Sequence, residues 1–170
     1  MIENFTRSET QSVALTLAKH HQFVSVARIF LAVLARSQDS AAAKHVRLEF
    51  WIGEGGLVGD IERLIDGLGS IVEGSIESSA VGGRVVVSSS MTADGGQFWT
   101  VRDPGSGRRR NLLEALGWPF HSARAGGSGL DFADACEMFR SHGGEVHLEF
   151  ERDLGTLVSI ELPRRQSDTR

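Results

Sequence analysis

The chain has 170 residues, of which 41% are hydrophobic and 24% are charged, and this composition fits one globular domain with a buried core. Its formal net charge of −4 argues against a nucleic-acid-binding surface, and its longest mostly apolar run, FVSVARIFLAVLA, is too short to cross a membrane. Cys136 is the single cysteine, so no internal disulfide forms, and the start of the chain lacks the layout of a signal peptide; both features favour a cytoplasmic protein.

The first half of the chain predicts a helix, a strand and a second helix. Apolar residues recur at helical spacing from Phe23 onward, which predicts a helix that ends near Ala43. The segment HVRLEFWI alternates between apolar and polar residues, the pattern of a half-buried strand, and GEGG then breaks it. A second apolar stripe from Ile61 to Val72 predicts another helix, with Asp60 as its N-cap.

The second half is rich in strands. RVVVSSSM and QFWTVRD read as two strands joined by the hairpin signal ADGG. After the loop PGSGRRR and a short helical segment, NLLEALG, a helix is expected from about Leu130 to Ser141, where HGG ends it. EVHLEFER and GTLVSIELP read as two further strands joined by DLG.

This order of elements predicts an α+β fold. We expect a two-layer α/β sandwich in which a mixed, mostly antiparallel sheet carries its helices on one face. The sequence divides into a tail or short helix at 1–22, one domain at 23–163 and a tail at 164–170.

Two glycine-rich segments indicate a binding site. In DPGSG, Asp103 follows a strand, where its carboxylate can accept a hydrogen bond from an exocyclic amine such as that of adenine, while Gly105 and Gly107 let the backbone approach a flat ligand. In GGSGL, Gly127 and Gly129 precede a helix, whose free N–H groups and dipole suit an anion. Each segment alone is common in turns, whereas the pair in this order is more specific.

At these segments the chain resembles the ATP-binding domain of sensor histidine kinases, in the GHKL superfamily. VRDPGSG is similar to the G1 box of that family, LGWPFHS to the connector that forms its ATP lid, and GGSGLDFADACEMFRSHGG to its G2 box and the helix that follows. The resemblance extends from about Phe23 to Pro163 and implies ATP or ADP as the ligand. The nucleotide-binding residues that it implies are Asp103, Gly105, Gly107, Gly127, Gly129 and Leu130.

The N box departs from the family. Members carry Asn-x-x-x-Asn, whose spacing puts both amides on one helix face, and the second Asn binds the Mg²⁺ that bridges the ATP phosphates. Ser70 and Gly74 occupy these positions here, and a one-residue slip that would bring Glu73 into the second position breaks the match of the apolar residues. Because Mg²⁺ uses few protein oxygens, the missing amide argues against Mg²⁺ binding, and no other residues form a metal-binding pattern.

The G2 helix carries a second departure. Asp131 stands where the family has another glycine, which puts a carboxylate at the helix N-terminus. This charge suits the helix dipole but repels a phosphate. Both departures favour a degenerate nucleotide site, or pseudokinase, without catalytic residues.

Three hypotheses follow. In the first, a degenerate domain acts in bacterial signalling by binding a protein, which is a kinase, a response regulator or a sigma-type factor, and a homodimer is compatible with it. In the second, the domain is a working histidine kinase or anti-sigma-type kinase that binds nucleotide through Asp103 and the glycines. In the third, a histidine phosphotransferase uses His20 or His21, although the twenty or so residues before the matched domain are too few for a hairpin of two long helices.

Overall fold

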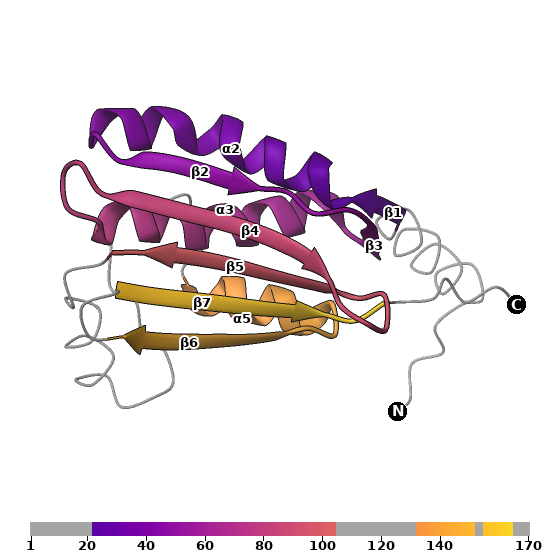
Figure 1. Cartoon of the computed structure of the whole chain (residues 1–170). Coiled ribbons are helices and arrows are strands. Elements are labelled where there is room, and N and C mark those ends of the chain that lie inside the picture. Colours follow the sequence, from indigo (N-terminus) through magenta and orange to yellow (C-terminus); the bar gives the residue numbers. More distant parts are fainter. Residues whose placement is uncertain (1–21, 105–131, 152–154, 165–170) are drawn as a thin grey trace, which may run out of the picture.

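A computed structural model describes residues 22–104, 132–151 and 155–164 of the chain. Within these ranges, each helix is followed by two strands (Figure 1). In chain order the elements are β1 (Gln22–Ser25), α2 (Val26–Ala43), β2 (Arg47–Trp51), β3 (Gly56–Gly59), α3 (Ile61–Ser78), β4 (Arg84–Met91), β5 (Gln97–Asp103), α5 (Phe132–Ser141), β6 (Glu145–Glu151) and β7 (Gly155–Leu162).

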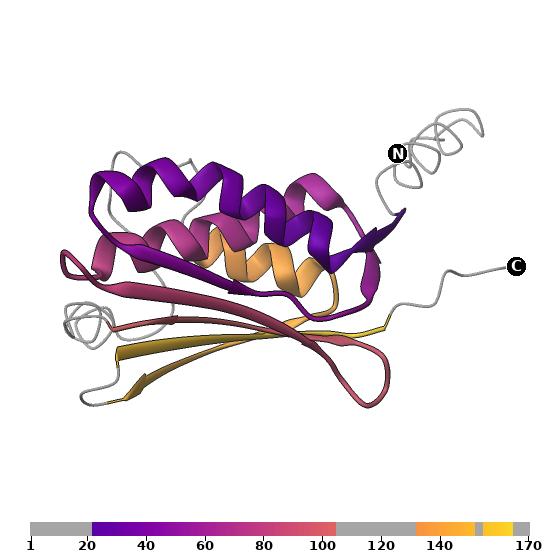
Figure 2. The ribbon, with the colours of Figure 1, turned by 45° about the horizontal axis from the view of Figure 1, so that its top comes forward.

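The main sheet has five strands in the order β2-β4-β5-β7-β6. β2 pairs with β4 in parallel, and the other neighbours pair antiparallel. Helices α2, α3 and α5 all lie on one side of this sheet (Figure 2). The prediction of a two-layer α+β sandwich with a mixed, mostly antiparallel sheet is therefore confirmed. Among the helices of the described ranges, none combines the length and apolar character that a membrane span needs.

Most of the predicted elements form where the sequence pattern placed them. The predicted N-cap of α3 is confirmed, because the Oδ1 atom of Asp60 accepts hydrogen bonds from the backbone N–H groups of Glu62 at 3.1 Å and Arg63 at 3.3 Å. The end of α5 is also confirmed: Gly143 adopts a φ of 76°, and its N–H donates to the carbonyl of Arg140. The helical segment NLLEALG and the turn before Gly155 lie outside the described residues.

The start of the first helix was predicted wrongly. Phe23 belongs to strand β1 and is 70% exposed, and α2 begins only after Ser25, whose hydroxyl caps it. β1 pairs antiparallel with β3, a second strand that the sequence pattern did not indicate. The pairing brings the backbones so close that a Cβ atom on Gly56 would lie 2.3 Å from the carbonyl oxygen of Val24. Gly56 belongs to the segment GEGG, which the sequence analysis took as the end of a strand, and the absence of its side chain is what permits this pairing.

An aromatic cluster joins the helices to the sheet. The indole of Trp99 in β5 is fully buried, and it meets Phe30 of α2 and Phe139 of α5 edge-to-face, with ring centroids 5.3 Å and 6.0 Å apart. Phe30 in turn meets Phe50 of β2 in the same manner at 6.1 Å. Such pairs add to the free energy of burial, so this cluster holds α2 and α5 at fixed positions over the centre of the sheet.

His142 connects the end of α5 to the start of α3. The ring is buried, its Nε2 atom accepts a hydrogen bond from the backbone N–H of Asp60 at 3.2 Å, and its Nδ1–H donates to the carbonyl of Met138 at 2.9 Å. This pair of bonds requires a neutral imidazole with its proton on Nδ1.

We expect His142→Ala to lower the free energy of unfolding by about 2–3 kcal/mol, because it removes both bonds and leaves a cavity. His147→Ala is the matched control: His147 is exposed on β6, and its replacement should change stability by less than about 0.5 kcal/mol. Urea unfolding followed by circular dichroism measures both. Equal effects of the two substitutions would contradict the connecting position of His142.

Candidate functional site

One stripe of α3 faces α5 and consists of very small residues. Gly67 marks this stripe, because a Cβ atom placed on it would lie 1.9 Å from the Cε atom of Met138 in α5. Ser70 and Gly74 follow three and seven positions later, so they lie on the same side of the helix. Both are half-buried. Ser70 and Gly74, which the sequence analysis assigns to the N-box positions, therefore lie on the same side of α3 as Gly67, and that assignment stays a prediction.

Asp103 lies at the C-terminal end of β5 and is buried, and it faces the last turn of α3. The hydroxyl of Ser78 lies 3.4 Å from the Oδ1 atom of Asp103 and 3.1 Å from the carbonyl oxygen of Ser75, so one hydroxyl hydrogen serves both oxygens. Ser78 is one turn beyond Gly74. The structure therefore brings Asp103 next to the end of the small stripe, which makes one continuous candidate site.

Two further polar residues complete the Asp103 end, and the motif analysis did not single them out. Thr156 of β7 is buried and is the register partner of Asp103, and Ser75 is buried next to Gly74. The hydroxyl of Ser75 has no hydrogen-bond partner within the described residues. Buried hydroxyl groups normally have partners, so this end of the site is polar beyond what its internal bonds require. The sequence offered no local signal for Thr156, because only the pairing of β7 with β5 places this threonine beside the aspartate.

Lys44, which follows α2, supports the same end of α3. Its ammonium group donates to the carbonyl of Ile76 at 2.9 Å and also to that of Glu77. The last carbonyls of a helix have no partner within the helix, and a cation there also favours the helix dipole. Lys44 thus holds the turn that carries Ser78 against Asp103.

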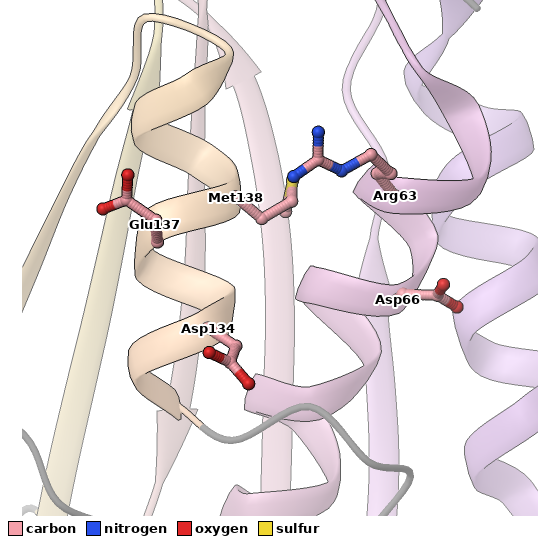
Figure 3. A pocket seen from close by; sticks show the side chains of 5 residues that line it. All are labelled: Arg63, Asp66, Asp134, Glu137 and Met138. Atoms are coloured by element: carbon pink, nitrogen blue, oxygen red, sulfur yellow. The ribbon is translucent and has the colours of Figure 1, made fainter.

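The opposite part of the α3–α5 boundary is acidic. A groove of about 380 Å³ lies between the two helices and is lined by Arg63, Asp66, Asp134, Glu137 and Met138. Figure 3 shows Asp66 and Arg63 on α3, and Asp134 and Glu137 on α5. Arg36 of α2 makes an ion pair with Asp66 at 2.6 Å, so α2 compensates part of the negative charge.

The described residues of the site fit adenine better than they fit Mg²⁺. A buried carboxylate with hydroxyl neighbours fits the exocyclic amine of adenine. The small stripe does not fit Mg²⁺, because Ser70 offers one hydroxyl and Gly74 offers no side chain. No group of three or more His, Cys, Asp or Glu side chains in the described part of the chain could hold a metal ion.

Several predicted site residues lie outside the described residues. These are Gly105, Gly107, Gly127, Gly129, Leu130 and Asp131, together with His20 and His21. The structure therefore reports on Asp103, Ser70 and Gly74, and the proposed anion site of the GGSGL segment stays a prediction.

Comparison with known proteins identifies the family. Residues 59–166 match the family model described as histidine kinase-, DNA gyrase B-, and HSP90-like ATPase. The chain belongs to this ATPase family. The matched range includes α3, Asp103 and α5, so it covers the whole candidate site described above.

Similar proteins include bacterial kinases. The chain is 30% identical over 105 residues to Sporulation kinase C of Bacillus subtilis (strain 168), a match that covers 62% of this chain and 24% of the relative. It thus spans about a quarter of the length of that protein.

Solved structures show the same fold. The mycobacterial sensor histidine kinase MprB superposes with a TM-score of 0.70 at 22% identity, over 86% of this chain and 99% of that one. The histidine kinase ThkA, solved in complex with the response regulator protein TrrA, superposes with a TM-score of 0.67 at 17% identity, over 93% of this chain and 49% of that one.

We expect Lys44→Met to lower the free energy of unfolding by about 1–2 kcal/mol, because the carbonyls at the end of α3 lose a charged donor while the apolar stem stays. Amide hydrogen exchange should rise selectively at Ser78 and Ser79. Arg28→Met, on the exposed face of α2, is the control and should leave both quantities unchanged. Unaltered exchange at the end of α3 in Lys44→Met would show that this lysine does not hold the turn.

Proposed function

We propose that the chain is a degenerate histidine-kinase-like ATP-binding domain that acts in bacterial two-component-type signalling by binding another protein, with weak or absent MgATP binding. The observation that carries the proposal is the small stripe of α3. Ser70 and Gly74 lie on the same side of α3 as Gly67, and we assign them to the positions where family members carry amides; neither supplies a metal-binding amide.

The electrostatics of the α3–α5 boundary support the proposal. Three carboxylates and one guanidinium line the groove there. A triphosphate carries several negative charges, and one that reached this groove without Mg²⁺ would meet the carboxylate of Asp134, whereas Asp66 is paired with Arg36. A ligand of this charge is therefore disfavoured at the boundary, whereas an uncharged adenine ring at Asp103 is not.

The proposed partner is a signalling protein: a kinase, a response regulator or a sigma-type factor. The complex of ThkA with a response regulator is the precedent in a protein of the same fold. The proposed binding unit is the domain 23–163, which includes all the described helices and strands apart from the first residue of β1.

Titration of the chain with ATP and ADP, each with and without Mg²⁺, tests the nucleotide part of the proposal. We expect a Kd weaker than about 1 mM for MgATP, equivalent to less than about 4 kcal/mol of binding free energy, because the amide ligand of the ion is missing. Addition of Mg²⁺ should change ATP binding by less than about threefold. Isothermal calorimetry measures these values, and a low-micromolar Kd for MgATP would refute the proposal.

The matched control for this titration restores the amides. The double variant Ser70→Asn, Gly74→Asn should bind ATP more tightly in the presence of Mg²⁺ than in its absence. A Mg²⁺ dependence that is the same in the variant and the parent would show that these two positions do not decide metal binding.

The second candidate function is that of a working nucleotide-dependent protein kinase, of histidine or anti-sigma (serine) type. The burial of Asp103 beside Ser78 and Thr156 favours it, since this is the part of the site that fits adenine.

Under this second candidate, Asp103→Ala should abolish ATP and ADP binding, whereas Asp94→Ala, in the exposed β4–β5 turn, should preserve it. Fluorescent nucleotide titration of both variants measures the effect. Binding that survives in Asp103→Ala would count against the second candidate.

A further inference from the structure

The outer face of the main sheet carries no helix. All three described helices lie on the other side, and within the described residues nothing covers the outer face (Figure 2). Side chains alternate along each strand, so the residues between the core positions point to this outer face. They include Val86 on β4, Phe98 on β5 and Leu157 on β7, which are only half-buried.

Like charges are paired at two corners of this face, with opposite signs. Arg47 of β2 and Arg84 of β4 are register partners and are both exposed. Glu145 of β6 and Glu161 of β7 are register partners as well, and both are exposed. Like charges directly opposite each other on neighbouring strands destabilise a sheet, and at the glutamate corner the imidazole of His147, 3.5 Å from the carboxylate of Glu145, offsets only one of the two charges.

The two corners are diagonally opposite. β2 and β4 both begin at the arginine corner, whereas β6 begins and β7 ends at the glutamate corner (Figure 1). Glu49 lies close to the arginine corner, and its carboxylate is 3.3 Å from a guanidinium nitrogen of Arg84. The corner keeps a net positive charge in spite of this pair.

The centre of the surface between the corners carries short side chains, whereas two larger ones lie on the same face: Trp51, which is 66% exposed and is the register partner of Ser88, and Arg102, which lies between Val86 and Leu157. Ser88 and Thr100 lie opposite each other and share a hydrogen bond of 2.6 Å, and Ser159 is the next residue across the sheet. The half-buried apolar side chains Val86, Phe98 and Leu157 flank this row. Short side chains that satisfy one another allow a second flat surface to approach closely.

We propose that the outer face binds the outer face of a second copy of this chain, with the arginine corner of each copy against the glutamate corner of the other. A two-fold axis that lies between the two sheets, parallel to them and perpendicular to the line that joins the corners, produces both contacts at once, as an isologous interface requires. The surface is self-complementary, and each contact relieves a like-charge pair within a copy. A basic or an acidic partner would satisfy one corner and be repelled by the other, which favours a second copy.

The size of the face sets the strength of this dimer. Five strands about 4.8 Å apart and about seven residues long cover roughly 600 Å² per copy, or about 1,200 Å² in total. This area is at the lower limit for specific interfaces, so the dimer is weak and depends on the charges. The inference does not rest on the state of the nucleotide site.

Sedimentation velocity over a range of concentrations tests the dimer. We expect a Kd of roughly 10–100 μM at about 50 mM salt, weakened at least about tenfold at about 500 mM salt, because exposed charges are screened. A chain that stays monomeric at about 500 μM in low salt, or a dimer that salt does not weaken, would overturn the proposal.

Two charge-reversed variants locate the interface. Arg47→Glu with Arg84→Glu makes both corners acidic, and Glu145→Arg with Glu161→Arg makes both corners basic. Each variant alone should be monomeric, whereas an equimolar mixture should form a heterodimer with an affinity at least equal to that of the parent dimer. A mixture that remains monomeric overturns the proposal, as do variants that dimerise like the parent.

The matched control replaces two arginines by glutamates, as the variant Arg47→Glu with Arg84→Glu does, but it does so on the helices. Arg28→Glu with Arg140→Glu should dimerise like the parent, and an equal loss of dimer in this control would overturn the assignment to the sheet. Circular dichroism melts confirm that each variant folds. Where a double variant does not fold, the single reversals Arg84→Glu and Glu161→Arg replace it. Each is measured alone and in an equimolar mixture, and the expected and contradicting results are the same as for the double variants.

Discussion

The structure depends on the placement of α3 between α2 and α5. The apolar face of this helix is buried against the sheet, and each of its ends is held by a side chain from another part of the chain. His142 accepts the hydrogen bond of Asp60 at the start, and Lys44 donates to the last carbonyls. These are the terminal backbone groups that a helix cannot satisfy itself. The same helix carries the small stripe and Ser78, so its placement also determines the geometry of the candidate site.

Local patterns in the sequence were sufficient for most elements and for the fold class. The alternation in QFWTVRD and the stripe of α3 each depend on neighbours within a few residues, so the pattern shows them directly. The pairing of β1 with β3 depends instead on a close approach at Gly56, and a glycine carries no signal of that kind. The contacts of His142 and Lys44 join residues far apart in the sequence, and a single sequence contains no record of them.

The sequence predicted only part of the candidate site, for the same reason. Asp103 could be proposed from a motif, and Ser70 and Gly74 from their distance along the chain, because spacing along one strand end or one helix is a local property; their roles stay predictions. Thr156 and Ser78 became part of the site through the register of β7 with β5 and the docking of the last turn of α3. Neither relation exists before the sheet and the helix layer are packed together. The acidic groove likewise needs α3 and α5 side by side before its charges add.

The two ends of the site, Asp103 at one and the α3 stripe with Ser70 and Gly74 at the other, are under different physical constraints. A buried carboxylate is costly without hydrogen-bonded neighbours, so Asp103 needs its polar surroundings whether or not adenine binds. The stripe of α3 imposes no such requirement. At Gly67 a small residue favours close packing against Met138, and Ser70 and Gly74 lie half-exposed, where losing an amide leaves no buried group unpaired. Loss of metal binding is therefore compatible with a stable fold, whereas loss of Asp103 would disturb the packing of β5, β7 and α3 together.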